Sequence, residues 1–241
     1  MLTDTSSPFG FTASHAGEPI DEQTIDVWEL TAARRALALL KSELGNDGML
    51  ELLDAQRKRS DEYFARMHKE SNGELRGAVN DFRVTGLTRE EFVAWFRDHG
   101  TDHASLVAQH PEHYVIGGSY DEQGNLATMH VMELIAGHTP HIFLDIVAPD
   151  ATEVFDQPLE SDVIVLAGRG RLANGVEVAR AFHQFTATAD GFTARMCSMF
   201  PAALPDSAFQ AHVEHHAIEW RNAIRMALAA KHASANPEHQ R

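Results

Sequence analysis

A histidine and a glutamate near the C-terminus have the residue types and the spacing of metal ligands. His215 and Glu219 stand four positions apart in a segment of helical periodicity, so their Cβ atoms leave one helix face about 5 to 6 Å apart. The polar stripe of Glu214, Arg221 and Arg225 lies more than about 100° away around the helix axis. The pair therefore points inward, where it either binds a divalent ion or forms a hydrogen bond between its members.

A second carboxylate strengthens the metal interpretation. Glu133 lies in a segment of strand-like alternation, Leu126 to Ile135, and alternation places it on an otherwise apolar face. The other members of that face are Ala127, Met129, Val131 and Ile135. Because an unpaired carboxylate is costly to bury, Glu133 on this face calls for a cation.

A histidine from the start of the sheet is expected to complete the ligand set. The segment His110-Pro111-Glu112-His113-Tyr114 leads into the first of several consecutive strands, and His110 and His113 are the candidates. His99 and His103 are close enough in sequence to take the same place. Two histidines and two carboxylates suit Zn²⁺, and Mn²⁺ or Fe²⁺ would also accept this set.

One further histidine and two tyrosines are candidates for contact with a substrate. His183 lies in the expected strand Val176 to Thr188 among apolar neighbours, where a histidine is more often a core residue. Beside a metal, however, it becomes a candidate general acid or base. Tyr114 and Tyr120 are the candidates for binding ligand oxygens.

Composition narrows the class of protein. The 241 residues carry a formal net charge of -15, which disfavours nucleic acid and anionic membrane surfaces as partners. The only cysteine is Cys197, so an internal disulfide and a cysteine-rich zinc site are both excluded. The N-terminus lacks a signal-peptide pattern and no apolar run reaches membrane-spanning length, so we expect a cytoplasmic protein.

The sequence also lacks G-x-S-x-G, H-E-x-x-H and G-x-x-x-x-G-K motifs, which disfavours serine hydrolases, zincins and nucleotide-binding proteins.

The N-terminal third of the chain has helical periodicity. Two helices are expected, over Asp21 to Leu44 and Met49 to Glu70, with Gly45 to Gly48 as the break between them. We expect a helical hairpin whose apolar stripe either covers the catalytic domain or forms a homodimer interface. Residues 1–74 are therefore assigned to an N-terminal helical elaboration, 75–232 to the catalytic domain and 233–241 to a disordered tail.

The rest of the chain predicts strands and one long closing helix. A capping box at Thr88 and Glu91 opens a short helix, and a helix is expected over Asp206 to Lys231. The expected strands are Leu75 to Val84, Tyr114 to Ser119, Leu126 to Ile135, His141 to Val147, Val163 to Leu172, Val176 to Thr188 and Phe192 to Phe200. Short turns between strands and a terminal helix indicate an α+β helix-grip fold of the Bet v 1 and START type, with a ligand cavity between sheet and helix.

The order of these motifs resembles that of the 2,4-diacetylphloroglucinol and phloretin hydrolases, which are zinc enzymes that cleave a carbon-carbon bond between an acyl group and a phenolic ring. The resemblance covers roughly residues 81 to 230. Its pieces are Leu87 to Phe92 with Trp95, Phe96 and His99; His110 to Tyr114; Met129 to Glu133; Phe182 to Gln184 with Gly191 and Arg195; and His215 to Glu219. Thr193, Cys197 and a shorter stretch between His113 and Glu133 depart from the family pattern.

The resemblance implies a function for each piece. It implies that His113, Glu133, His215 and Glu219 bind zinc, that His183 is a catalytic histidine beside the metal, and that the substrate is a phenolic ketone similar to an acylphloroglucinol. Two alternatives stay open. One is a helix-grip protein that binds a hydrophobic molecule without turning it over, and the other is a metal-dependent cyclase or lyase.

Overall fold

The computed structural model describes residues 12–147 and 162–235. The chain forms two compact units, Met1–Leu44 and Gly45–Arg241. All of the residues expected to carry chemistry belong to the second unit.

The first unit contains a hairpin that was not predicted from the sequence. Strands β1 (Ala13–His15) and β2 (Glu18–Ile20) pair antiparallel across a two-residue turn. Ala16 and Gly17 take positive φ angles of 52° and 88° in that turn, as short hairpin turns require. Helix α1 (Glu22–Leu52) follows, and the carboxylate of Asp21 accepts a hydrogen bond from the backbone N–H of Thr24 at 2.7 Å.

The predicted helix break is confirmed at Gly45, whose φ of 59° and ψ of -173° are not helical. The break is narrower than expected, because the helical backbone resumes directly after it. A second interruption at Leu53 precedes α2 (Asp54–Glu70). Pairing of the two helices as a hairpin, and a dimer built on them, stay predictions.

The second unit is organised by a seven-stranded antiparallel sheet, and each of the seven strands was predicted closely at both ends. Their order across the sheet is β3-β9-β8-β7-β6-β5-β4. The strands are β3 (Leu75–Thr85), β4 (His113–Tyr120), β5 (Leu126–Glu133), β6 (His141–Val147), β7 (Val163–Arg171), β8 (Glu177–Thr188) and β9 (Gly191–Pro201).

Two helices connect β3 to β4. Helix α3 (Arg89–Asp98) begins with the predicted capping box: the backbone N–H of Glu91 donates to Thr88 Oγ1, and that of Thr88 donates to Glu91 Oε2. Helix α4 (His103–Gln109) was not predicted, since so short a helix has less than about two turns of periodicity. Both helices pack against α5.

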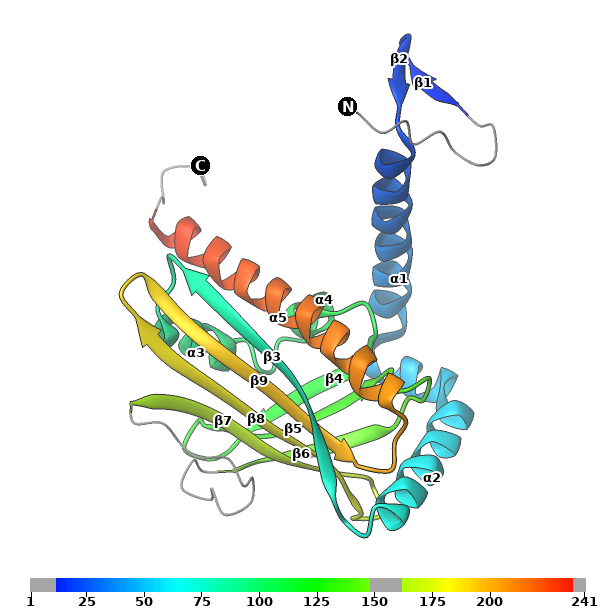
Figure 1. The fold of residues 1–241 in the computed structure, drawn as a ribbon, viewed down its shortest axis with the longest axis vertical. Coiled ribbons are helices and arrows are strands. Elements are labelled where there is room, and N and C mark those ends of the chain that lie inside the picture. The colour runs from blue at the N-terminus through cyan, green and yellow to red at the C-terminus, as the bar shows by residue number, and fades with distance from the viewer. Residues whose placement is uncertain (1–11, 148–161, 236–241) are drawn as a thin grey trace. The chain divides into compact units, whose positions relative to one another are not determined.

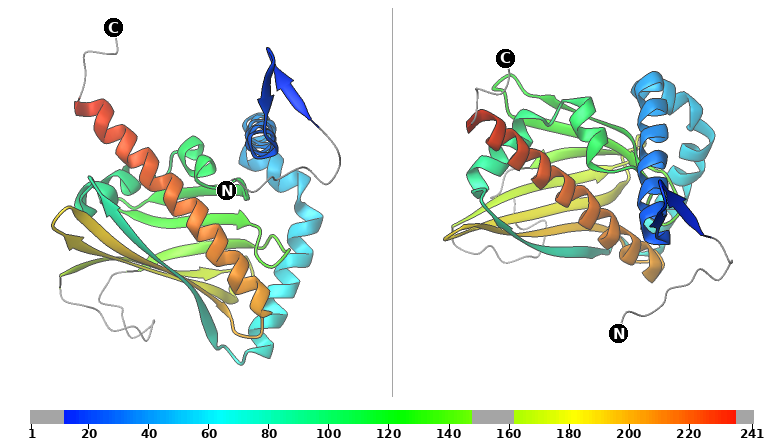
Figure 2. Two further views of the ribbon diagram at one scale, coloured as in Figure 1. Left: turned by 45° about the horizontal axis from the view of Figure 1, so that its top comes forward. Right: turned by 90° about the horizontal axis from the view of Figure 1, so that it is seen from above.

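The C-terminal helix α5 (Asp206–Ala235) runs across one side of the sheet (Figures 1 and 2). It is longer than the expected Asp206 to Lys231, so the first residues assigned to a disordered tail are helical, and residues 236–241 lie outside the described chain. Its Trp220 and Ala223 pack on an aromatic cluster that includes Phe92, Phe185 and Phe192. Burial of each such ring stabilises the fold by about 1.5 to 3 kcal/mol. Sheet and helix together form the predicted α+β helix-grip fold.

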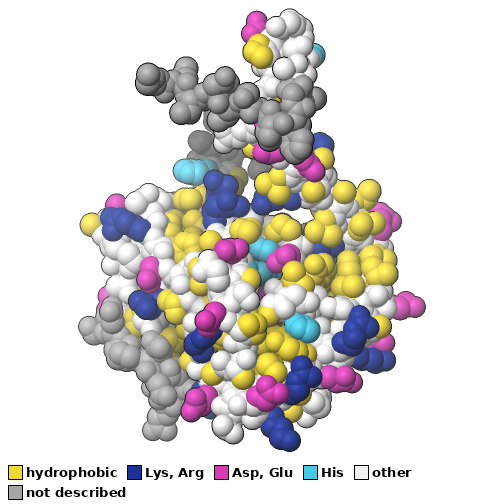
Figure 3. All heavy atoms as spheres, turned by 45° about the vertical axis from the view of Figure 1, so that its right-hand side comes forward, with side chains coloured by type: hydrophobic (Ala, Val, Ile, Leu, Met, Phe, Trp, Pro, Cys, Tyr) yellow, Lys and Arg dark blue, Asp and Glu magenta, His cyan; other side chains and the backbone are white. Residues whose placement is uncertain are grey.

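No helix in the described parts of the chain is long and apolar enough to span a membrane. On the face shown in Figure 3, acidic and basic side chains are scattered among hydrophobic and neutral ones.

Candidate metal centre

The four side chains predicted to bind a metal come together between the sheet and α5. The Nε2 atoms of His113 and His215 lie 3.2 Å apart. Glu133 Oε2 lies 3.3 Å from Nε2 of His215 and 3.6 Å from Nε2 of His113, and Glu219 Oε1 lies 3.7 Å from Nε2 of His113. His113 opens β4, Glu133 ends β5, and α5 supplies the other two one turn apart.

The spacing of these donor atoms fits a single ion. Bonds of about 2.0 to 2.2 Å arranged as a tetrahedron place neighbouring donor atoms about 3.3 to 3.6 Å apart. Three ligand atoms, from His113, Glu133 and His215, all lie within 4.8 Å of one another. Glu219 lies at the edge of this cluster, where its Oε1 atom is near Nε2 of His113.

A backbone hydrogen bond fixes the tautomer of His113. Its Nδ1 lies 3.0 Å from the carbonyl oxygen of Leu106, and because a carbonyl can only accept, Nδ1 carries the proton. The lone pair of Nε2 therefore points into the cluster, as in histidines that bind metals. The site is deeply buried, and His113 is fully enclosed. Because imidazole lone pairs and two carboxylates converge in it, the site requires a positive charge among them.

The pKa shifts of the side chains in the cluster also indicate that it needs a positive charge. Burial lowers the pKa of His215, but the carboxylates of Glu133, Glu112 and Glu219 outweigh it and raise that pKa to about 10. Burial opposes ionisation of Glu133, yet His215 holds the pKa of its carboxyl well below the usual range. Burial raises the pKa of Glu219 to about 7. A proton on His215 thus supplies the positive charge when no metal does.

The structure distinguishes His113 from the three alternative ligands. His99 and His103 direct Nδ1 to backbone carbonyl oxygens, of Trp95 at 2.8 Å and of Ile116 at 3.3 Å, as His113 does to that of Leu106, so this contact does not separate the three. The ring of His110 stacks on that of His215, with 3.7 Å between ring centroids. Only His113 of these four approaches both Glu133 and Glu219 in the described structure.

Three residues of the site were given no role from the sequence. Glu112 Oε2 lies 3.8 Å from Nδ1 of His215. His212 lies nearly parallel to the ring of His215, and His216 shares a hydrogen bond of 2.9 Å with Ser198. For the two histidines the signal was present in the sequence, since positions 212, 215, 216 and 219 recur at helical spacing and mark one face of α5.

A cavity of about 280 Å³ adjoins the cluster, close to the lower end of the range for ligand pockets. Its lining is mostly apolar and comes from the sheet, α3 and α5. Polar groups in the lining include His113, Glu133 and Glu219 of the cluster together with His183, Ser198, His212 and His216. A small hydrophobic molecule in this cavity would meet three of the candidate ligands, His113, Glu133 and Glu219, in its wall.

His183 is among the residues that line the cavity, and its catalytic role stays a prediction. Its Nδ1 accepts a hydrogen bond from the backbone N–H of Cys197 at 3.3 Å, so the proton of the neutral ring is on Nε2. Burial lowers the pKa of His183 to about 4, and the ring is therefore neutral near pH 7. Trp220 packs against it with 4.9 Å between ring centroids.

The two tyrosines are not placed as expected, because neither is among the residues that line the described cavity. The hydroxyl of Tyr120 donates to the carbonyl oxygen of Arg97 at 2.6 Å on an exposed edge. A register shift between His113 and Val115 in the pairing of β4 with β5 interrupts the alternation of side chains. Tyr114 packs against the apolar cluster of Met49, Val115 and Met132.

Comparison with known proteins yields similarity of fold only. No protein family model matches the chain, and no curated protein matches it. A crystal structure of Ara h 8.0201 is similar over 65% of this chain and 99% of its own, with 12% identity and a TM-score of 0.45. A hypothetical protein from Helicobacter pylori matches 63% of this chain and 88% of its own, with 12% identity and a TM-score of 0.42. A START superfamily protein from Mycobacterium smegmatis matches 65% of this chain and 95% of its own, with 9% identity and a TM-score of 0.36.

Proposed function

We propose that the protein is a zinc-dependent hydrolase that cleaves the carbon-carbon bond between an acyl group and a phenolic ring. The observation that carries the proposal is the convergence of His113, Glu133, His215 and Glu219 beside an apolar cavity, whose lining includes all of these except His215. The activity itself is taken from the ordered resemblance of the motifs to acylphloroglucinol hydrolases.

The donor set fits Zn²⁺, which when bound polarises a ketone or phenolate oxygen and lowers the pKa of a water molecule. The protein contributes the rest of the site. Apolar side chains such as Leu144, Leu166 and Phe200 enclose the aromatic ring and exclude bulk water. His183 presents Nε2–H as a hydrogen-bond donor to an oxygen of the substrate, because the N–H of Cys197 occupies Nδ1.

The hydrogen bond from Cys197 refines the role expected for His183. From the sequence, His183 was a candidate for general acid or base chemistry. In the structure its only basic nitrogen accepts from the backbone, so we assign it the stabilisation of negative charge on a substrate oxygen. Delivery of a proton from His183 to the ring carbon would require this hydrogen bond to rearrange.

The direct test is incubation of the zinc-loaded protein with acylphloroglucinols and measurement of the released carboxylic acid. We expect acid and deacylated phenol in equal amounts from the wild type and none from Glu133→Gln. The matched control is Glu122→Gln, which removes an exposed carboxylate from the turn after β4. A zinc-loaded wild type that releases no acid from any acylated phenol would contradict the proposed reaction and favour a cyclase or lyase.

A second candidate function rests on the cavity. Its largely apolar lining would also suit a protein that holds a hydrophobic molecule without chemistry. This candidate predicts that ligand affinity is the same with and without zinc and is unchanged in Glu219→Ala.

A further inference from the structure

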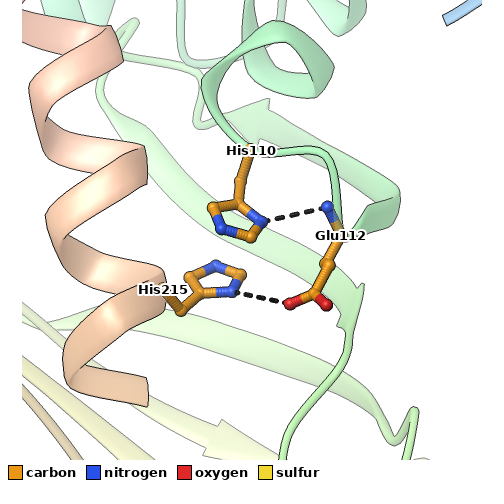
Figure 4. Close-up of side chains that lie close together, drawn as sticks. All are labelled: His110, Glu112 and His215. Carbon is orange, nitrogen blue, oxygen red and sulfur yellow. Dashed lines mark hydrogen bonds and ion pairs between the residues drawn. The ribbon is translucent and has the colours of Figure 1, made fainter. Parts of the chain in front are cut away.

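The imidazole of His215 lies among five other ionisable side chains, from His110, Glu112, His113, Glu133 and His212. His110 stacks on it at 3.7 Å between centroids with planes 22° apart, and the ring of His212 lies 5.2 Å away with planes 8° apart. Its Nε2 faces His113 and Glu133, whereas its Nδ1 faces Glu112 Oε2 at 3.8 Å. Figure 4 shows the Nδ1 side of the His215 ring, where His110 and Glu112, from the loop before β4, approach His215 on α5.

The atoms on the Nδ1 side have two interpretations. His110, Glu112 and His215 offer three ligand atoms within 4.8 Å of one another, which is close enough for a second metal ion. Alternatively, Glu112 accepts the Nδ1–H of His215 and so orients its Nε2 toward the first ion.

The ring geometry argues against a second ion. A metal lies near the plane of each imidazole that binds it, yet His110 and His215 are stacked with nearly parallel planes, so one ion cannot lie near both planes. Nδ1 of His110 is also occupied, since it accepts the backbone N–H of Glu112 at 3.0 Å. That hydrogen bond instead fixes the backbone from which the Glu112 side chain reaches His215.

We propose that Glu112 is a positioning residue that holds His215 as the Nδ1–H tautomer and thereby presents its Nε2 lone pair to the metal. The proposal rests on the metal centre proposed above and adds a residue to it. Metal-binding histidines almost always donate their other N–H to a carboxylate, carbonyl or water. His113 donates to Leu106 O, and Glu112 gives His215 the corresponding partner.

Glu112 lies near the surface, so its proposed role in positioning His215 can be tested without disturbing the packing of the core. Its side chain is 40% exposed, whereas that of His215 is 2% exposed. Removal of the carboxylate therefore opens no cavity in the core. The present 3.8 Å is longer than a hydrogen bond of about 2.7 to 3.2 Å, and an exposed glutamate has the freedom to close that gap.

The test is zinc affinity, measured by competition with a chromophoric chelator in wild type, Glu112→Ala and Glu112→Gln. We expect Glu112→Ala to weaken zinc binding by about 10- to 100-fold, the range for loss of an outer carboxylate. Glu112→Gln, which keeps an acceptor without the charge, should fall between the two. Glu214→Ala is the matched control, because Glu214 is the exposed neighbour of His215 on α5, and its affinity should equal that of the wild type.

A second measurement reports the tautomer directly. In ¹⁵N NMR spectra of the zinc-loaded protein, Nδ1 of His215 should carry a proton that exchanges slowly in the wild type and faster in Glu112→Ala. Both variants should still unfold cooperatively in the metal-free state, which shows that they remain folded.

The outcomes are distinguishable. If the wild type binds no zinc, the proposed metal centre fails and this inference with it. If the wild type binds one zinc ion and Glu112→Ala binds it equally well, only the role of Glu112 is overturned. Two zinc ions per chain, with the second lost in Glu112→Ala, would assign Glu112 to a second metal site and also overturn the inference.

Discussion

Nε2 of His113 and Nε2 of His215 lie 3.2 Å apart, although the two residues are 102 positions apart in the sequence. The first strand of a hairpin at the sheet edge supplies one and the closing helix supplies the other. Because the Leu106 carbonyl orients the lone pair of His113 toward His215, the contact is stable only with a proton or a metal ion between these groups and the neighbouring carboxylates.

Removal of Glu133 should abolish tight zinc binding. Glu133 approaches both histidines, so its loss removes a ligand and the negative charge that balances the ion. We expect zinc affinity in Glu133→Gln to fall by more than about 100-fold, beyond the effect of losing an outer partner. Isothermal titration calorimetry measures this, with Glu122→Gln as the control. Wild-type affinity in Glu133→Gln would exclude Glu133 as a ligand.

Zinc should stabilise the folded protein, because the four ligands converge only in the native state. At a free zinc concentration about 1,000 times the dissociation constant, the gain in free energy of unfolding is about 4 kcal/mol. Differential scanning calorimetry should show a higher melting temperature with zinc, reversed by a chelator. His215→Ala should show no such shift, and an equal shift in that variant would locate the zinc elsewhere.

Substitution of His183 should impair catalysis and spare the metal. The residue lies on the cavity wall and is not among the clustered ligand atoms. In His183→Ala we expect kcat on an acylated phenol to fall by about 100-fold or more, as for loss of a donor to a developing oxyanion, with one zinc ion still bound per chain. A variant that keeps wild-type kcat would remove His183 from the mechanism, and loss of zinc would reassign it to the metal centre.

Burial of neutral His183 should make the fold sensitive to acid. Burial lowers its pKa to about 4, below the about 6.5 of an unfolded chain. The unfolded state therefore binds a proton first, and stability falls as the pH drops from about 6.5 to 4, by at most about 3 kcal/mol from this residue. Urea unfolding of wild type and His183→Gln at pH 7 and pH 4.5 measures it. Equal losses of stability in the two proteins would contradict the assignment.

Periodicity was enough to predict the large elements of the fold but not the small ones. Strands and α5 have many residues with a repeating apolar pattern, so their positions were predicted closely. The β1–β2 hairpin and α4 are too short to show a pattern. The end of α5 was missed because its last residues, His232 to Ala235, include no large apolar side chain that would continue the stripe.

Three of the four candidate metal ligands could be singled out from the sequence because each had a local signal, whereas His113 had three alternatives. His215 and Glu219 share a helix face, and Glu133 interrupts an apolar strand face. The tyrosines had no such signal in the sequence, and neither is among the residues that line the described cavity. Glu112 was missed because its partner is on α5, and no pattern within its own segment reveals that contact.

The most direct test of the metal centre is the metal content of the protein. The protein is purified without chelators, dialysed against zinc and then against metal-free buffer, and measured by inductively coupled plasma mass spectrometry beside Glu133→Gln. We expect one zinc ion per wild-type chain and none in the variant. Absence of bound zinc, manganese or iron from the wild type after loading with each would contradict the proposed metal centre.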